Sequence, residues 1–431
     1  MGPESLPIGE LIAVRRRGAA NPSAGTPGER KAKAASSSSS PLVGRIVQVE
    51  IERIVPGGLG LAHAEGRTLF VSLAAPGDHA RVVIERVRGK SAFASIVEIT
   101  RPSSARVRPP CPYFGRCGGC DFQQLNYDAQ LAAKLEIIRD CLRRIAGIDL
   151  PPGLLRIIRA PDEWRYRARA QWQFDAERGA FGYYERGTHR VVDVAACPVL
   201  VPELQNALEQ LRKDTPANHS GGEFQVVAGE DGVSLATGAD HQVGQLVSRV
   251  IRGERYFFSA NGFFQINHQL LADLVEEAVR DYAGDTALDL YCGVGLFSLP
   301  LARRFARVIG VEGNPGAVRL AERNAREASL GNLQFATDGV EQWLAHQVKQ
   351  LTGVDLILLD PPRAGAGQEI IEAVLRIAPR CISYVSCDPA TLARDLRALT
   401  ASYRVETITA LDMFPQTHHV ETVAQLKRKD R

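Results

Sequence analysis

Alternating apolar and polar residues fill the first strongly patterned part of the chain, from Leu42 to about residue 100. The segments VGRIVQVEIERIV, HARVVIERV and SAFASIVEI repeat with a period of two, which is typical of half-buried β-strands. Turn-forming segments such as Pro56-Gly57-Gly58 and Pro76-Gly77-Asp78 separate these strands. Several short strands in so short a span predict a small β-barrel at residues 42–100.

The pattern changes to helical spacing between residues 121 and 146. The apolar residues that share one face of this predicted helix are Leu131, Leu135, Ile138, Leu142 and Ile145. A strand-rich stretch follows, and within it the segment RYRARA, residues 165–170, predicts a strand. Its three arginines would face RNA while Tyr166, Ala168 and Ala170 face the core; the alternative is an ordinary exposed strand.

From about Asp285 onward, apolar strands alternate with helical segments. The strand candidates are ALDLY, RVIGVE, NLQFAT, VDLILLD, CISYVS, VETITAL and VETVAQL. Strands that are apolar on both faces and joined by helices predict a parallel, doubly wound α/β sheet. We therefore expect a tail at residues 1–41, the barrel at 42–100, a central α+β domain at 101–260 and a Rossmann-like domain at 261–431.

Composition adds little to the choice of partner. The net charge is only +3, although residues 1–41 form a basic, low-complexity tail that ends in a serine run and that we expect to be disordered. No stretch approaches the ~20 apolar residues of a membrane helix. The apolar patch at residues 11–14 is too short for a signal peptide. We expect a cytoplasmic monomer without membrane contact.

The first strand of the doubly wound region runs into Asp289-Leu290-Tyr291-Cys292-Gly293-Val294-Gly295. Such a glycine turn is where this fold binds a nucleotide-like ligand. The third glycine of a dinucleotide fingerprint is replaced by Ser298, which favours S-adenosylmethionine over NAD because the former has no pyrophosphate to cradle. Glu312 ends the next strand, where a carboxylate accepts hydrogen bonds from ribose hydroxyls.

Cys387 stands in the segment SCDP, at the end of the fifth strand and hence at the ligand-binding edge. Carbon 5 of uracil is too weak a nucleophile to take a methyl group directly, whereas addition of a thiolate at C6 activates it. A base must then remove the C5 proton, and residues 418–421, His-His-Val-Glu, offer candidates. The alternative for any cysteine, a small buried hydrophobe, fits Cys141, Cys292 and Cys381.

Three further cysteines, Cys111, Cys117 and Cys120, form a C-x5-C-x2-C pattern in a loop rich in glycine and proline, and Cys197 is a candidate fourth. Four thiolates complete either a zinc site or an iron–sulfur site. The spacing is atypical of zinc ribbons, which favour two C-x2-C pairs, and it differs from the C-x3-C-x2-C of radical enzymes. Disulfides are not expected without an export signal.

These residues together resemble a known family, the RNA 5-methyluridine methyltransferases of the TrmA/RlmD type, in its iron–sulfur branch with an N-terminal TRAM domain. The resemblance covers about residues 42–431. The matching segments are CPYFGRCGGCDFQ, FFQIN, DLYCGVG, GVEGNP, LDPPRAG, YVSCDPATLARDL and DMFPQTHHVETV. The resemblance implies an OB-like barrel that binds RNA, S-adenosylmethionine as cofactor, and methylation of a uridine, most readily in 23S rRNA, with tRNA as the alternative.

The resemblance also implies roles for individual residues: Cys387 as nucleophile, Glu421 as general base, a [4Fe-4S] cluster on Cys111, Cys117, Cys120 and Cys197, and cofactor contacts from Gln265, Tyr291, Glu312, Asp338 and Asp360. Two positions depart from the family pattern, Asp388 where Asn is usual and Leu296 where some members have Asn. Two other classes of protein are alternatives to such an enzyme. A non-catalytic RNA-binding protein would not need an intact Cys387 and Glu421, and an electron carrier would not need the methyl-transfer residues.

Overall fold

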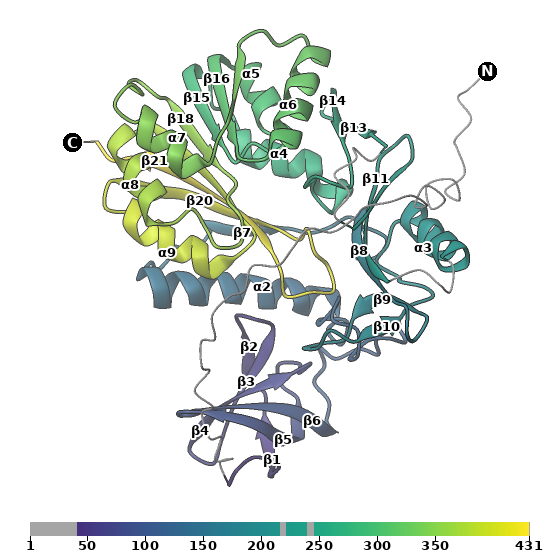
Figure 1. Cartoon of the computed structure of the whole chain (residues 1–431). Coiled ribbons are helices and arrows are strands. Elements are labelled where there is room, and N and C mark those ends of the chain that lie inside the picture. Colours follow the sequence, from purple (N-terminus) through teal and green to yellow (C-terminus); the bar gives the residue numbers. More distant parts are fainter. Residues whose placement is uncertain (1–40, 216–220, 239–244, 431) are drawn as a thin grey trace, which may run out of the picture.

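The structure is a computed structural model that describes residues 41–215, 221–238 and 245–430. The predicted tail at residues 1–41 lies outside the described residues, apart from Pro41. Three parts are visible in Figure 1: a small barrel, a central sheet carrying helix α3 (Pro202–Asp214), and a larger sheet covered by helices. None of the helices in the described ranges has the length and apolar character needed to cross a membrane.

The barrel consists of six strands in the order β1-β5-β6-β4-β3-β2. Their bounds are β1 Ile46–Glu50, β2 Arg53–Val55, β3 Leu59–Ala64, β4 Arg67–Ser72, β5 His79–Arg88 and β6 Ser91–Arg101. The pattern of period two is confirmed, since alternate residues of β1, β4 and β5 are buried. Ile54 of β2 points out of the barrel instead and packs in the core of the large sheet, so β2 attaches the barrel to the rest of the molecule.

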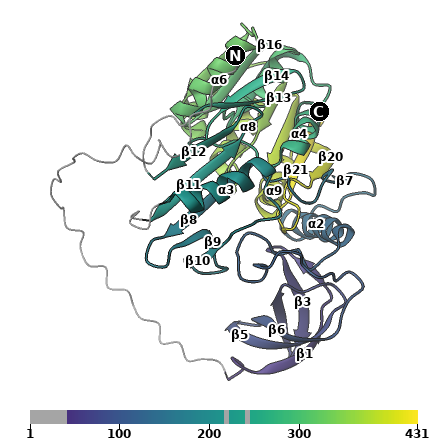
Figure 2. The ribbon, with the colours of Figure 1, turned by 90° about the vertical axis from the view of Figure 1, so that its right-hand side faces the viewer.

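Helix α2, Tyr127–Cys141, lies between the barrel and the large sheet in both views (Figure 1 and Figure 2). The prediction that helix starts at residue 121 is wrong, because the Asn126 side chain accepts a hydrogen bond from the Ala129 amide and caps the helix there. After Cys141 the chain continues as the π-helix η1, Leu142–Ala146. The wider turn rotates Ile145 out of the predicted face, and this residue is 37% exposed.

The central part is a five-stranded sheet in the order β10-β9-β8-β11-β12, with α3, Pro202–Asp214, against it. The strands are β8 Arg169–Asp175, β9 Ala180–Tyr184, β10 Val191–Asp193, β11 Gly222–Ala228 and β12 Val233–Thr237. A two-stranded hairpin follows, β13 Val247–Ile251 and β14 Glu254–Phe258. This hairpin packs through Tyr256 and Phe258 into a core of the large sheet, so apolar contacts join the hairpin to the large sheet.

The predicted row of RNA-facing arginines at residues 165–170 is wrong. Strand β8 begins only at Arg169, and Arg165 has a left-handed backbone with φ 49°. Arg167 lines a cavity among cysteines, and Arg169 donates hydrogen bonds to backbone carbonyls of the loop at 260–262. The side chain of Arg165, by contrast, is 69% exposed. The residues between them are buried as predicted: Tyr166, Ala168 and Ala170.

The large sheet has eight strands in the order β17-β16-β15-β18-β19-β21-β20-β7. The strands are β7 Leu155–Ile158, β15 Gly284–Leu290, β16 Phe305–Glu312, β17 Leu333–Thr337, β18 Leu356–Leu359, β19 Cys381–Ser386, β20 Tyr403–Leu411 and β21 Glu421–Arg428. The helices are η2 His268–Leu270, α4 Leu271–Val279, α5 Ser298–Ala302, α6 Pro315–Glu327, α7 Val340–Gln347, α8 Gln368–Ile377 and α9 Pro389–Leu399. Two apolar cores, one on each side of the sheet, bury its strands.

The Rossmann-like prediction is confirmed in outline, and the structure corrects it at one end. Strands β15 to β19 are parallel, as expected for a doubly wound sheet. Strand β21 is antiparallel to β19 and to β20, because the loop at 412–420 joins β20 to β21 without a crossover helix. Strand β7 joins the edge of this sheet although it comes from residues 101–260, which the sequence assigned to the central domain.

Candidate active site

The parallel strands end at one edge of the sheet, and the turn after β15 begins the site there. Tyr291, Gly293 and Gly295 have left-handed backbones with φ 68°, 54° and 89°. A Cβ atom on Gly295 would lie 3.0 Å from the Leu299 side chain, so glycine is needed both for the turn and for the packing of α5. Tyr291 itself is half-buried and packs against one of the two apolar cores of the large sheet.

Glu312 and Asp338 lie next to each other at the ends of β16 and β17. The Glu312 carboxylate accepts hydrogen bonds from the amides of Gly293 at 3.2 Å and Asn314 at 2.7 Å. The Asp338 amide donates to the Glu312 carbonyl at 3.1 Å. The structure therefore brings three predicted cofactor residues, Tyr291, Glu312 and Asp338, to one end of the sheet.

Two buried carboxyls follow on neighbouring strands. Burial raises the pKa of Asp289 to about 7, although a hydrogen bond from the Ser298 hydroxyl opposes this. Burial also raises the pKa of Asp360 to about 7, and the nearby Asp289 raises it further. The sequence singled out Asp360 and used Asp289 only as the start of the glycine turn. A cationic ligand at this end of the sheet would stabilise the ionised form of both groups.

Cys387 and Glu421 are brought together by strand pairing. The antiparallel register of β19 and β21 sets Ser386 opposite Thr422, and the Thr422 hydroxyl donates to the Ser386 carbonyl at 2.8 Å. The next positions along the two strands are Cys387 and Glu421. Burial raises the pKa of the half-buried Cys387 thiol to about 12, and the Glu421 carboxylate raises it further. Glu421 is buried, and its pKa lies well above the ordinary value because of that burial.

Arg363 supplies a positive charge to this pair. It lowers the pKa of both Cys387 and Glu421, against the effect of their burial. Two residues of α9 hold its loop. The Thr391 hydroxyl donates to the Arg363 carbonyl at 3.3 Å, and the Arg394 guanidinium donates to the Ala364 carbonyl at 2.9 Å. The sequence used Arg363 only to argue against amino-group methylation, and the structure adds that it acts on both predicted catalytic groups.

Asp388 begins helix α9 directly after Cys387. Its side chain accepts hydrogen bonds from the amides of Ala390 and Thr391, both at 2.9 Å. Asp388 therefore replaces the usual Asn as a helix cap without loss of the cap geometry. Leu296, the other departure, is 7% exposed and packs in an apolar core.

Gln265 lies in the segment between β14 and η2, beside the residues that lead into β8. Its side chain is buried, and its segment is fixed by the Ala168 amide, which donates to the Ile266 carbonyl at 2.8 Å. The same segment carries Phe263, whose side chain is 67% exposed. The neighbouring Phe264 stacks on Phe258 with ring centroids 3.9 Å apart, so the aromatic pair anchors the loop that presents Phe263.

The four remaining predicted ligands, Cys111, Cys117, Cys120 and Cys197, line one cavity. Burial raises the pKa of Cys120 to about 12 and that of Cys197 to about 11, and Arg167 lowers both. Two guanidinium nitrogens beside the cavity, Arg167 Nε and Arg186 Nε, are buried without a hydrogen-bond partner among the described residues. No group of three or more His, Cys, Asp or Glu side chains in the described ranges is arranged to hold a metal ion.

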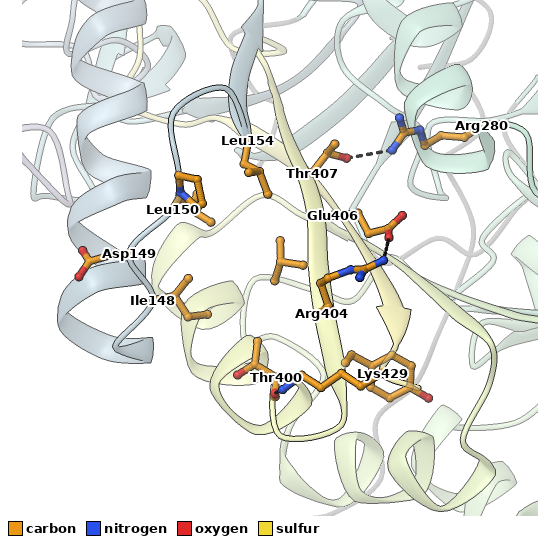
Figure 3. A pocket seen from close by; sticks show the side chains of 13 residues that line it. Ile148, Asp149, Leu150, Leu154, Arg280, Thr400, Arg404, Glu406, Thr407 and Lys429 are labelled. Atoms are coloured by element: carbon orange, nitrogen blue, oxygen red, sulfur yellow. Dashed lines mark hydrogen bonds and ion pairs between the residues drawn. The ribbon is translucent and has the colours of Figure 1, made fainter. Parts of the chain in front are cut away.

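A cavity of about 830 Å³ lies elsewhere, between β20, the β7 side of the sheet and the end of α9 (Figure 3). Its lining includes none of the residues predicted for catalysis or cofactor binding. Two arginines on its rim are already engaged, since Arg404 pairs with Glu406 and Arg280 donates to the Thr407 hydroxyl. We therefore do not assign this cavity as the active site, although it is large.

Comparison with known proteins agrees with the geometry. A family model described as tRNA (Uracil-5-)-methyltransferase matches residues 205–429, and the TRAM domain model matches residues 41–97. A 23S rRNA (uracil(1939)-C(5))-methyltransferase RlmD of Pectobacterium atrosepticum is 35% identical over 417 residues, which cover 87% of this chain and 92% of the relative. An uncharacterized RNA methyltransferase of Thermosynechococcus vestitus is 34% identical, with coverage of 89% and 98%.

Among solved structures, the tRNA (uracil-54, C5)-methyltransferase of Pyrococcus abyssi in complex with S-adenosyl-L-homocysteine superposes with a TM-score of 0.68 at 26% identity. The match covers 88% of this chain and all of that one. The fold class apart from its iron–sulfur loop, the TRAM domain, and the resemblance to the RNA 5-methyluridine methyltransferases are thereby confirmed. With a family model over more than half of its length and relatives over nearly nine-tenths of it, the chain belongs to the tRNA (uracil-5-)-methyltransferase family, the S-adenosylmethionine-dependent methyltransferases of uracil C5 in RNA.

Proposed function

We propose that this chain methylates carbon 5 of a uridine in 23S rRNA through a covalent adduct on Cys387. The single observation that carries the mechanism is the register of β19 and β21, which sets Cys387 beside Glu421. The choice of rRNA is supported by the relative that acts on 23S rRNA, which is 35% identical, whereas the tRNA enzyme of similar fold is 26% identical.

Cys387 provides the nucleophile. Its thiolate sulfur bonds to C6 of the pyrimidine, and the electron pair of the C5–C6 double bond moves to give an enolate whose C5 takes the methyl group. S-adenosylmethionine would supply that group from its sulfonium sulfur, with cleavage of the S–CH3 bond and release of S-adenosylhomocysteine. Burial holds the Cys387 pKa near 12, and the Arg363 cation opposes this, so we assign to Arg363 the stabilisation of negative charge at the reacting sulfur.

Glu421 completes the reaction as base. Its carboxylate takes the C5 proton, the C5–H electron pair re-forms the double bond, and the C6–S bond breaks to return the Cys387 thiolate. A buried carboxylate with a raised pKa is a stronger base than an exposed one, and burial raises the pKa of Glu421 well above its ordinary value. Solvent exclusion around it also keeps water from competing for the intermediate.

The strand ends hold the methyl donor. Glu312 has lone pairs left over from its two backbone bonds with which to accept ribose hydroxyls. We assign the surrounding cofactor contacts to Tyr291, Asp338, Asp360 and Gln265. The two buried carboxyls Asp289 and Asp360 place negative potential where the sulfonium cation would lie.

We further propose that Cys111, Cys117, Cys120 and Cys197 hold a [4Fe-4S] cluster. All four side chains line one cavity, which brings together the four thiolates that an iron–sulfur centre needs, and the C-x5-C-x2-C spacing is atypical of zinc ribbons. The partnerless guanidinium nitrogens of Arg167 and Arg186 complement its negative charge. The cluster would hold the loop in place, and no step of the methylation passes through it.

The iron assignment is tested by elemental analysis of protein purified without oxygen. We expect iron and sulfide in amounts that fit one four-iron centre per chain. Stoichiometric zinc with little iron would remove the cluster from the proposal. Cys141→Ser provides the matched control, because Cys141 is buried in an apolar core away from the cavity and its change should leave the iron content alone.

The methylation mechanism is tested with Glu421→Gln. This variant should transfer the methyl group and then stall, so a denaturing gel should retain a protein–RNA band that depends on Cys387. Glu406→Gln, an acid of β20 paired with Arg404, is the control and should turn over normally. Assays on fragments of 23S rRNA and on tRNA decide the substrate. Absence of the band together with normal turnover would exclude Glu421 as the base.

A further inference from the structure

We propose that Asp121 is a positioning residue for proton removal by Glu421. It acts through a clamp on residues 416–418, the segment that leads into the catalytic strand. The inference rests on the proposed function, since it assigns Asp121 to one step of that mechanism. Asp121 follows Cys120 in sequence and lies 297 residues from His418, so only the tertiary structure brings the two together.

The clamp has a side-chain half and a backbone half. The Asp121 carboxylate accepts hydrogen bonds from both nitrogens that His418 offers it, the backbone amide at 2.8 Å and Nδ1 at 2.5 Å. The backbone amides of Asp121 and Phe122 both donate to the Gln416 carbonyl, at 3.1 Å and 3.0 Å. Four hydrogen bonds from two consecutive residues therefore fix Gln416 and His418, the two ends of the three-residue segment.

Gln416 needs this support because its backbone is left-handed, with φ 67°. A non-glycine residue holds such a conformation only where its surroundings determine it. Besides its carbonyl, its amide nitrogen donates to Gln130 at 2.9 Å, and its side chain donates to Glu163 at 3.1 Å. Gln416 is 1% exposed, so water cannot replace these partners.

His418 is also in contact with the barrel. Gly58, in the turn between β2 and β3 of the barrel, lies against it, and a Cβ atom built on Gly58 would be 2.8 Å from the His418 Cβ. The Phe122 ring meets the imidazole edge-on, with centroids 6.4 Å apart. The barrel, the cysteine loop and the catalytic segment therefore meet at one histidine.

The clamp should act on Glu421 and leave Cys387 unaffected. Glu421 is the first residue of β21, so the sheet fixes the chain after it, while the segment at 412–420 fixes the chain before it. Cys387 is held independently, between β19 and the Asp388 cap of α9. Loosening the clamp should thus misplace the carboxylate that takes the C5 proton, and leave formation of the C6–S bond intact.

The test compares Asp121→Ala with Asp121→Asn in the full-length protein. For Asp121→Ala we expect kcat to fall by about 10- to 100-fold, since misplacement of a reacting group by about 1 Å costs up to this factor. The methylated covalent adduct should accumulate, as in Glu421→Gln, and KM for RNA should fall together with kcat, because release of the adduct becomes rate-limiting. Asp121→Asn keeps an acceptor for the His418 amide and should recover part of kcat. Asp128→Ala is the matched control, an acid with an 86% exposed side chain on α2, and should behave as wild type.

His418→Ala removes the imidazole that hydrogen-bonds to the Asp121 carboxylate. It serves as a second variant in case Asp121→Ala disturbs the adjacent Cys120. If Asp121→Ala loses its iron or its fold, His418→Ala alone should still accumulate adduct. The double variant should be no worse than the poorer single one, because the two residues act as a pair. Slow turnover without adduct, or normal turnover in His418→Ala, overturns the role of Asp121. If Glu421→Gln also forms no adduct, the proposed mechanism itself is wrong, which separates the two failures.

Discussion

The affinity for S-adenosylmethionine should fall as the pH is lowered through 7. Burial raises the pKa of Asp360 to about 7, with a further rise from Asp289. A protonated carboxyl is neutral and does not attract the sulfonium cation, so the ligand binds the ionised form. The affinity for S-adenosylmethionine is therefore highest at pH values above the raised pKa and decreases as the pH falls below it. Binding releases a proton.

The magnitude follows from that pKa. If binding requires ionised Asp360, Kd should be about twofold above its high-pH limit at pH 7 and about 11-fold above it at pH 6. Between pH 8 and pH 6 the loss is therefore about tenfold, or about 1.4 kcal/mol. S-adenosylhomocysteine has no sulfonium charge, so its Kd should change much less over the same range.

Calorimetric titration of both ligands at pH 6, 7 and 8 measures this difference, and repeats in buffers of different ionisation enthalpy count the released protons. Asp360→Asn should bind more weakly and show a flatter profile, because one of the two buried titrating carboxyls is gone and Asp289 remains. Glu369→Gln, an exposed acid of α8, should keep the wild-type profile. A Kd for S-adenosylmethionine that is constant from pH 6 to pH 8 would refute the reasoning.

Three further outcomes are expected. Cys387→Ala should abolish turnover while cofactor and RNA still bind, measured by methyl incorporation and gel shift; a rate near wild type would exclude the covalent route. Lys134→Met should lower the free energy of unfolding by about 3–5 kcal/mol in urea titrations, because it leaves the fully buried Asp412 carboxylate without its cation; a loss below about 1 kcal/mol would contradict this. Joint replacement of Arg88 and Lys90, both exposed in the barrel, by alanine should lower the slope of log affinity against log salt by about 1.4 for single-stranded RNA, whereas an unchanged slope would place the phosphate contacts elsewhere.

Features that depend on neighbours in sequence were predictable. The alternation of β1, β4 and β5, the glycine turn after β15 and the apolar strands β15 to β19 are all written in runs of a few residues. Cys387 could be chosen because it follows an apolar strand and precedes Asp-Pro, a combination that marks the ligand-binding edge. Cys141 and Cys381 were assigned correctly as buried because their own segments are apolar, and Cys292, in the glycine turn, is buried as well.

Features that depend on what a side chain faces could not be predicted from the sequence. A pattern of period two says that the arginines of RYRARA share a side, but it does not say that Arg167 faces a cavity of cysteines. The antiparallel β20 and β21 could not be inferred either, because apolar strands read alike in both directions.

The sequence alone therefore determined the family, the three kinds of domain and the chemistry that the chain carries. The tertiary structure decided which groups meet: Glu421 with Cys387 across two strands, and Asp121 with His418 across 297 residues. Pairings of this kind arise when separate elements pack together and bury their polar groups against each other. No local pattern encodes them, because each partner is an ordinary residue in its own segment.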